Sequence, residues 1–136
     1  MKDWFIYSFI ALLLWGLWGF FPKLAIRYIS PRSAFVYECL GSVIVGIFAL
    51  VLVGFRPEVK MNGMIFAILT GIAGTFGALF FLYAMARGKT SVVVTTSALY
   101  PIVTILLAFI ILKEPVTFKE GIGILFALMA IVMFSL

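Results

Sequence analysis

The chain has 136 residues, of which 65% are hydrophobic and 11% are charged. Soluble domains carry about 25% charged residues, so this composition excludes a water-soluble core protein. The ten basic residues that give the net charge of +5 are scattered without a cluster, which argues against a nucleic-acid partner.

Five apolar stretches follow one another along the chain, each close to the roughly 20 residues that cross about 30 Å of hydrocarbon. The sequence therefore predicts an all-α integral membrane protein, one domain of five transmembrane helices, in the inner (plasma) membrane of the cell. The expected spans cover residues 4–29, 34–55, 61–86, 92–112 and 118–136. Because five is odd, we expect the two termini on opposite sides of the membrane.

Lys and Arg fall equally on the two sides of this arrangement. When sides alternate from the N-terminus, one side carries Lys2, Arg56, Lys60, Lys113 and Lys119, and the other carries Lys23, Arg27, Arg32, Arg87 and Lys89. Such residues in short loops set orientation, so neither orientation is strongly preferred. A protein that inserts both ways can pair with an opposed copy, and inverted pairs are the scaffold of many transporters. We expect an antiparallel homodimer; the alternative is an ordinary protein of single orientation.

The first span carries two tryptophans, Trp15 and Trp18, three residues apart and hence on one helical face. Gly16 and Gly19 leave room for a neighbour or a ligand to approach the backbone. The two indole rings are candidates to line a cavity, and the alternative is a packing or lipid-facing role.

The second span holds Glu38, an acidic side chain well inside an apolar segment. An ionisable group in a span is costly and is by default a functional candidate with a partner. Lys23 is the expected partner, because a rise of 1.5 Å per residue puts both groups roughly 8–9 Å below the same membrane surface. The pair would be either a proton-coupling carboxylate or a static ion pair that fixes the hairpin.

The third and fourth spans differ in what they offer. Small residues dominate the third, which predicts close helix packing, and Tyr83 near its end can hydrogen-bond in a cavity. The fourth carries Thr96 and Tyr100, and its proline, Pro101, predicts a kink that frees backbone carbonyls. One helical face of this span holds Ser97, Pro101, Thr104 and Ala108. We assign this face to the substrate path; the alternative is that its hydroxyls bond to their own helix.

The fifth span has Gly123, Ala127 and Ala130 at spacings of four and three. Such a seam of small residues suits close association of helices. We expect it to form the dimer interface. A chain that ends near residue 136 is either a natural single repeat or half of a longer protein.

The chain resembles the EamA domain of the drug/metabolite transporter superfamily. The resemblance rests on the run YAMARGKTSV from Tyr83, then ALYPIVTILLA, LKEPVT and GIGIL. It extends back to Trp15-Gly16, Lys23 and Ser30-Pro31. It implies a metabolite or drug exporter, in a family where most members are tandems of two inverted five-span repeats around a central cavity. One repeat alone fits an opposed homodimer, as in the smaller four-span multidrug relatives.

Those relatives use a glutamate of the first span for proton exchange, but Glu38 lies in the second, so that role does not carry over by position. Lys23, Pro101 and Glu114 match positions that recur in the EamA pattern. The resemblance leaves Glu114 as a capping or salt-bridging residue at the surface.

These observations predict a transporter half-unit that moves a small organic solute by alternating access, through a cavity lined by spans 1, 3 and 4 of two copies. The expected substrate-binding residues are Trp15, Trp18, Tyr83, Thr96, Tyr100 and Pro101. Their aromatic, largely uncharged character favours amphipathic or weakly polar solutes. The alternatives are a lipid-linked sugar flippase subunit and a non-transporting membrane scaffold. No nucleophile and base pair, metal cluster or phosphate-binding loop is apparent, so we expect neither enzyme activity nor a cofactor or metal.

Overall fold

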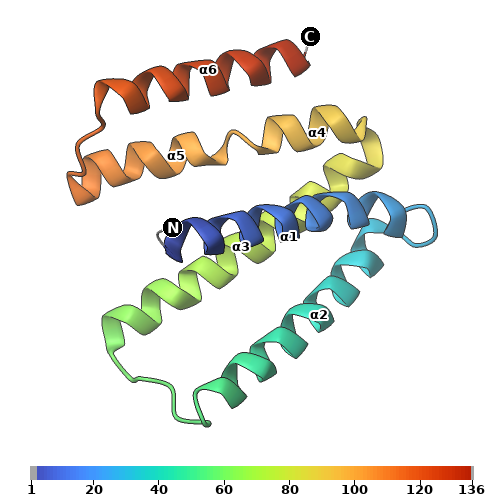
Figure 1. Ribbon diagram of the computed structural model, residues 1–136. Helices are drawn as coiled ribbons and strands as arrows, with labels where there is room; N and C mark the ends of the chain where they lie inside the picture. Colours follow the sequence, from blue (N-terminus) through green and yellow to red (C-terminus); the bar gives the residue numbers. More distant parts are fainter. Residues whose placement is uncertain (1–2, 136) are drawn as a thin grey trace. The chain divides into compact units, whose positions relative to one another are not determined.

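The computed structural model describes residues 3–135, which fold into helices joined by short loops (Figure 1). The elements are α1 (Asp3–Ala25), α2 (Pro31–Leu52), α3 (Met61–Arg87), α4 (Thr90–Ser97), α5 (Tyr100–Leu107), the π-helical segment η1 (Ala108–Leu112) and α6 (Phe118–Ser135). No strand occurs in this described range, so the predicted all-α class is confirmed. The chain divides into two compact units, Met1–Arg87 and Gly88–Leu136.

Four helical segments are long and apolar enough to cross a membrane. They are Asp3–Ala25, Pro31–Leu52, Met61–Arg87 and Thr90–Leu112, the last made of α4, α5 and η1. The helix α6 has 18 residues, which at a rise of 1.5 Å give a length of ~27 Å, close to the thickness of the hydrocarbon core. The chain is a multi-pass membrane protein, and Leu136, the last residue of the expected fifth span, lies outside the described residues.

Local sequence sets where the first two helices meet. α1 ends at Ala25, four residues before the expected boundary, because residues 26–29 form a turn ahead of the next helix. Ser30 then caps α2, its hydroxyl accepting a hydrogen bond from the Ser33 amide at 3.3 Å. Pro31 follows at the first helical position, where its fixed φ and missing N–H are well tolerated.

The other end of α2 is closed by a glycine. Gly54 has a φ of 61°, which places it in the left-handed region. Its amide donates to Val51 O at 2.9 Å, and the Phe55 amide donates to Leu50 O at 3.0 Å. These two bonds satisfy carbonyls that the helix end leaves without partners, in the pattern of a Schellman motif.

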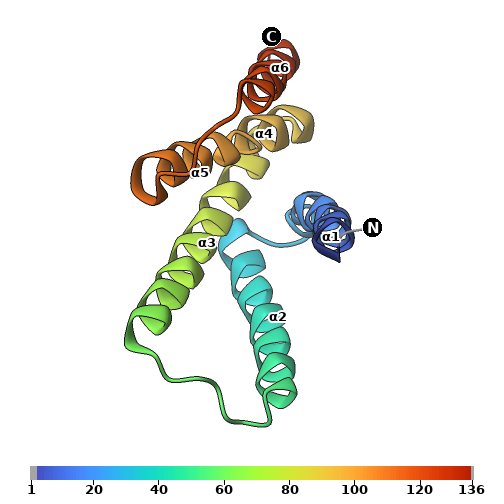
Figure 2. The ribbon, with the colours of Figure 1, turned by 60° about the vertical axis from the view of Figure 1, so that its left-hand side comes forward.

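The packing of the first unit is concentrated where α2 begins and α3 ends. Figures 1 and 2 both show these two helices converging there and diverging toward the loop that joins them. The buried residues of the unit gather near this convergence, and they are Gly19, Pro22, Ala34, Ala78, Phe81, Leu82 and Met85. Residues 40–77, which cover the diverging parts of both helices and their loop, are all exposed in the isolated chain.

In the second unit the fourth span is broken, as the proline predicts. Pro101 has no N–H, so the carbonyl of Ser97 cannot accept the bond that a continuous helix would supply. Shorter bonds take over, with the Leu99 amide donating to Thr96 O at 3.2 Å and the Ile102 amide to Leu99 O at 3.0 Å. The span is therefore two helical segments, α4 and α5, separated by two turn residues.

A capping box starts α6. The Thr117 amide donates to Glu120 Oε2 at 2.8 Å, and the Glu120 amide donates to Thr117 Oγ1 at 3.3 Å. The reciprocal bonds satisfy amides that the first turn would leave unpaired. This end of the helix is thus specified by the sequence Thr-Phe-Lys-Glu.

Candidate functional site

The centre of the candidate site is Glu38 of α2, a half-buried carboxylate. Its Oε1 accepts a hydrogen bond from Nε1 of Trp18, on α1, at 2.7 Å. This distance lies within the normal range of an N–H···O hydrogen bond. The bond joins two helices through the one acidic side chain that the second span contains.

Trp18 also contacts the third helix of the unit. Its ring stacks on Phe81 of α3, with the ring centroids 5.1 Å apart and the planes inclined by 23°. Phe81 is buried, so this side of the indole is held against the packed end of α3. A single side chain therefore bridges α1 to both α2 and α3.

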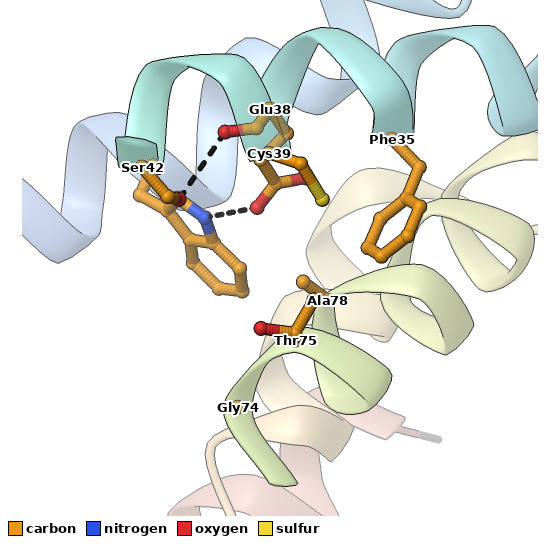
Figure 3. A pocket seen from close by; sticks show the side chains of 8 residues that line it. Phe35, Glu38, Cys39, Ser42, Gly74, Thr75 and Ala78 are labelled. Atoms are coloured by element: carbon orange, nitrogen blue, oxygen red, sulfur yellow. Dashed lines mark hydrogen bonds between the residues drawn. The ribbon is translucent and has the colours of Figure 1, made fainter. Parts of the chain in front are cut away.

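A pocket of about 210 Å³ opens beside this contact (Figure 3). It is lined by Trp18, Phe35, Glu38, Cys39, Ser42, Gly74, Thr75 and Ala78. Gly74 and Ala78 leave the space on the side of α3, because neither carries a side chain beyond Cβ. The pocket thus has α1, α2 and α3 as walls and Glu38 as its carboxylate.

The two hydroxyls of the lining bond to their own helices. Ser42 Oγ donates to the backbone carbonyl of Glu38 at 3.2 Å, and Thr75 Oγ1 donates to Gly71 O at 2.6 Å. Each hydroxyl has then used its proton, while its oxygen can still accept. The pocket therefore presents acceptors, from Glu38, Ser42 and Thr75, more than donors.

A second, larger pocket of about 490 Å³ shares two wall residues with the first, Phe35 and Thr75. Its other lining residues are Ile68, Gly71, Ile72, Phe76 and Leu79, all on α3. Apart from the Thr75 hydroxyl, the side chains of this lining are apolar. A small polar pocket and a larger apolar pocket thus adjoin along α2 and α3.

Two basic side chains of this unit, Lys23 and Arg32, have hydrogen bonds to groups outside the pocket lining. Lys23 Nζ donates to the backbone carbonyl of Met85 at 2.8 Å, and Arg32 Nε donates to the hydroxyl of Tyr83 at 3.0 Å. Lys and Arg are absent from the described residues that line the two pockets. In the structure Glu38 accepts a hydrogen bond from Trp18, and Lys23 donates one to the carbonyl of Met85. The ion pair between Lys23 and Glu38 remains a prediction.

The other predicted substrate residues are dispersed. Trp15 is exposed on α1, and Tyr83 is half-buried near the end of α3, bonded to Arg32. Thr96, Tyr100 and Pro101 belong to the second unit, at and around the break of the fourth span. Trp18 is the member of this set that the structure brings to Glu38.

Sequence reasoning placed the cavity on spans 1, 3 and 4 and so missed the contribution of α2. Phe35, Cys39 and Ser42 all line the pocket with Glu38. The signal was available for two of them, because Phe35 and Ser42 lie three and four residues from Glu38 and share its helical face, whereas Cys39 is its immediate neighbour in the chain.

The predicted dimer seam lies on α6. Gly123, Ala127 and Ala130 are all exposed in the isolated chain, and a Cβ built on Gly123 meets nothing within 4 Å. Their role in pairing two copies remains a prediction.

Two comparisons with known proteins match the chain. A family model described as the EamA-like transporter family matches residues 2–136. An uncharacterised protein of Methanocaldococcus jannaschii is 25% identical over 133 residues, which cover 96% of this chain and 95% of that protein. That relative is therefore also about the length of one five-helix repeat. No solved structure matches the chain.

Proposed function

Because the chain belongs to the EamA-like transporter family, whose members are membrane transporters of the drug/metabolite type, we propose that it exports a small organic solute by alternating access. In this proposal the working unit is an antiparallel homodimer, and the solute binds in the pocket beside Glu38. The observation that carries the proposal is the Glu38 carboxylate, bonded to Trp18 and open to a pocket of about 210 Å³ between three helices.

The chemistry of the pocket supports a role in binding. A carboxylate inside a span is retained at a cost, and in transporters such groups mark the path of a substrate or a proton. Trp18, Glu38 and Thr75 come from three different helices, so a solute in contact with all three responds to their relative positions. Alternating access requires such a link between occupancy and helix arrangement.

The surface of the first unit supports assembly with a second copy. Residues 40–77 are exposed, and within α2 and α3 this stretch is strongly apolar. Inverted repeats in transporters enclose a site that neither repeat encloses alone. The balanced distribution of Lys and Arg, the small residues of α6 and the one-repeat length of the relative all fit a pair of opposed copies.

The first experiment is transport into reconstituted vesicles. A panel of labelled cationic, neutral and anionic solutes is tested with and without a proton gradient, using wild type, Glu38→Gln and the matched control Glu58→Gln. Glu58 is a suitable control because it is a loop carboxylate, largely exposed and paired with Lys60 at 3.4 Å. We expect Glu38→Gln to lower the rate about tenfold or more, and Glu58→Gln to leave it unchanged.

Two results of this assay decide the proposal. If the wild-type protein moves no member of the panel, the proposal that this chain transports a small solute is wrong. If Glu38→Gln transports with an unchanged rate and pH dependence, Glu38 neither binds the solute nor couples it to protons. The same assay on Thr96→Ala, Tyr100→Phe and Pro101→Ala variants tests the predicted part of the fourth span.

Topology is tested separately by cysteine labelling on intact cells. The single native cysteine is removed by Cys39→Ser, and Val59→Cys places a new thiol in the loop after α2, where Val59 is 79% exposed. An impermeant maleimide should label about half of the molecules from each side if insertion is dual. Labelling from one side only would contradict the antiparallel homodimer.

A lipid-linked sugar flippase subunit is the second candidate, and one observation favours it. The pocket of about 490 Å³ has an almost wholly apolar lining on α3 and Phe35 of α2, a surface suited to a lipid chain. A lipid-linked sugar carries an anionic phosphate, however, which the Glu38 carboxylate of the adjoining pocket would repel. Transfer of a phosphate-linked lipid that does not depend on Glu38 would favour the flippase over the solute exporter.

A further inference from the structure

We infer that the solute is an amphipathic organic cation, with its ammonium group beside Glu38 and its apolar tail in the adjoining pocket. The inference rests on the proposed function, because it names the substrate class of the same site. It is carried by the juxtaposition of an acidic pocket and an apolar pocket that share Phe35 and Thr75.

The first argument is charge. The described lining of the smaller pocket contains the carboxylate of Glu38 and no Lys or Arg. Lys23 donates a hydrogen bond to Met85 O, and Arg32 donates one to Tyr83 Oη. A carboxylate in a span is stabilised by a positive partner. A bound cation would supply that charge inside the pocket, whereas an anion would meet repulsion at a low dielectric constant.

The second argument is the surroundings of the carboxylate. Trp18 occupies Oε1 with its indole N–H at 2.7 Å, and a carboxylate offers about four acceptor positions over two oxygens, so acceptor capacity remains for a cation. The rings of Trp18 and Phe35 line the same pocket. Aromatic faces within about 6 Å attract ammonium groups, and tryptophan attracts them most strongly.

The third argument is size and polarity. The acidic pocket, about 210 Å³, is smaller than the roughly 300–1,000 Å³ of most ligand sites, so it suits a compact head group. The apolar pocket, about 490 Å³, falls within that range and is lined by Ile68, Ile72, Phe76 and Leu79. A molecule with one positive end and one apolar end would use both.

Binding to the full chain in lipid nanodiscs tests the inference. The probe is labelled hexyltrimethylammonium, with tetramethylammonium and hexanesulfonate as competitors. Tetramethylammonium keeps the head without the tail, and hexanesulfonate keeps the tail with the opposite charge. We expect tetramethylammonium to compete about tenfold more weakly than unlabelled probe or worse, and hexanesulfonate not to compete.

Two variant pairs assign the two ends of the ligand. Glu38→Gln should weaken binding of the probe about tenfold or more, while Glu58→Gln stays within about twofold of wild type. From butyl to hexyl, the affinity of wild type should rise by up to roughly fourfold per methylene group. Ile72→Asn, in the apolar pocket, should flatten this dependence, while Ile44→Asn, at an exposed site of α2 outside both pockets, should not.

The inference is overturned if hexanesulfonate competes as well as the unlabelled cation, or if Glu38→Gln binds the probe like wild type. Should Glu38→Gln fail to fold, the competition series on wild type still decides. The vesicle assay separates the two levels of the argument. If wild type moves a neutral or anionic solute but binds no cation, the substrate class is wrong and transport stands; if it moves none of the three classes, the proposed function itself fails.

Discussion

The two ends of the first unit use the same helices in opposite ways. Where α2 begins and α3 ends, Ala34, Phe81, Leu82 and Met85 are buried, and the Lys23 and Arg32 side chains bond to α3. Toward the loop that joins α2 and α3, residues 40–77 are exposed, and the helices diverge (Figure 2).

The difference shows that the helices of this unit are tightly packed against one another at one end only. The linings of the two pockets extend from the packed end, with Glu38 and the buried Ala78, to the open part of α3, with Ile68 and Ile72. The packed end fixes the geometry of the Glu38 site, while the open end leaves apolar surface for lipid, a ligand tail or a second copy.

The largest effect should separate the two ends directly. Leu82 is 1% exposed at the packed end and Leu69 is 52% exposed on the open part of the same helix. Leu82→Ala should lower the free energy of unfolding by about 2–4 kcal/mol, because it leaves a cavity in packed surroundings. Leu69→Ala should change it by less than about 1 kcal/mol. Denaturation in mixed micelles, followed by circular dichroism, measures both; equal losses would remove the distinction between the ends.

The next largest effect should come from the hydrogen bond between Trp18 and Glu38. Trp18→Phe keeps an aromatic ring for the stack on Phe81 but removes the N–H that donates to Glu38. We expect a loss of about 2 kcal/mol, because a half-buried carboxylate loses a donor. Trp4→Phe, at an exposed position near the start of α1, is the control in the same denaturation assay. A loss no larger than that of the control would show that the hydrogen bond does not stabilise the unit.

At the open end, backbone conformation should matter more than packing. Gly54→Ala should cost about 1 kcal/mol, because Gly54 has a φ of 61° and an alanine there is strained. Gly46→Ala, in the interior of α2 and facing open space, should instead raise the free energy of unfolding by about 0.5 kcal/mol. Opposite signs in thermal unfolding of the two variants are the expected result, and a shared sign would mean that Gly54 is not conformationally required.

The smallest effect is expected from the polar contact at the packed end. Arg32 and Tyr83 hydrogen-bond at 3.0 Å, but Arg32 is exposed, so water competes for both groups. A double-mutant cycle with Arg32→Met and Tyr83→Phe should give a coupling energy of about 0.5 kcal/mol. A coupling above about 2 kcal/mol would mean that polar bonds, and not apolar burial, hold the helices together at this end.

The helices were largely predictable because each is specified locally. The five apolar stretches correspond to five helical regions, of which the fourth is divided into α4, α5 and η1. The second helix runs over Pro31–Leu52 and not over the expected 34–55, because Ser30 and Pro31 set its start and Gly54 its end. The expected first span was too long, since it ran to residue 29 while α1 ends at Ala25. Apolar character alone set that estimate, and it cannot distinguish a helix from an apolar turn.

The candidate site was only partly predictable because it depends on direction around the helix axis as well as on depth. Depth alone makes Lys23 a reasonable partner for Glu38. Trp18 and Lys23, however, are five residues apart, so their side chains leave α1 in directions about 140° apart. The structure shows Trp18 directed to Glu38 and Lys23 to Met85, and no pattern in the sequence states which face of α1 meets α2.

Trp18 contacts both the carboxylate of the candidate site and the packed end of α3. One indole is hydrogen-bonded to a carboxylate on α2 through its nitrogen and is stacked on a buried phenyl ring of α3 through its face. Any rotation of that side chain large enough to release the carboxylate also shears the stack. A rotation of this ring would therefore change its contacts with α2 and α3 together, so one rigid side chain on α1 links the two neighbouring helices.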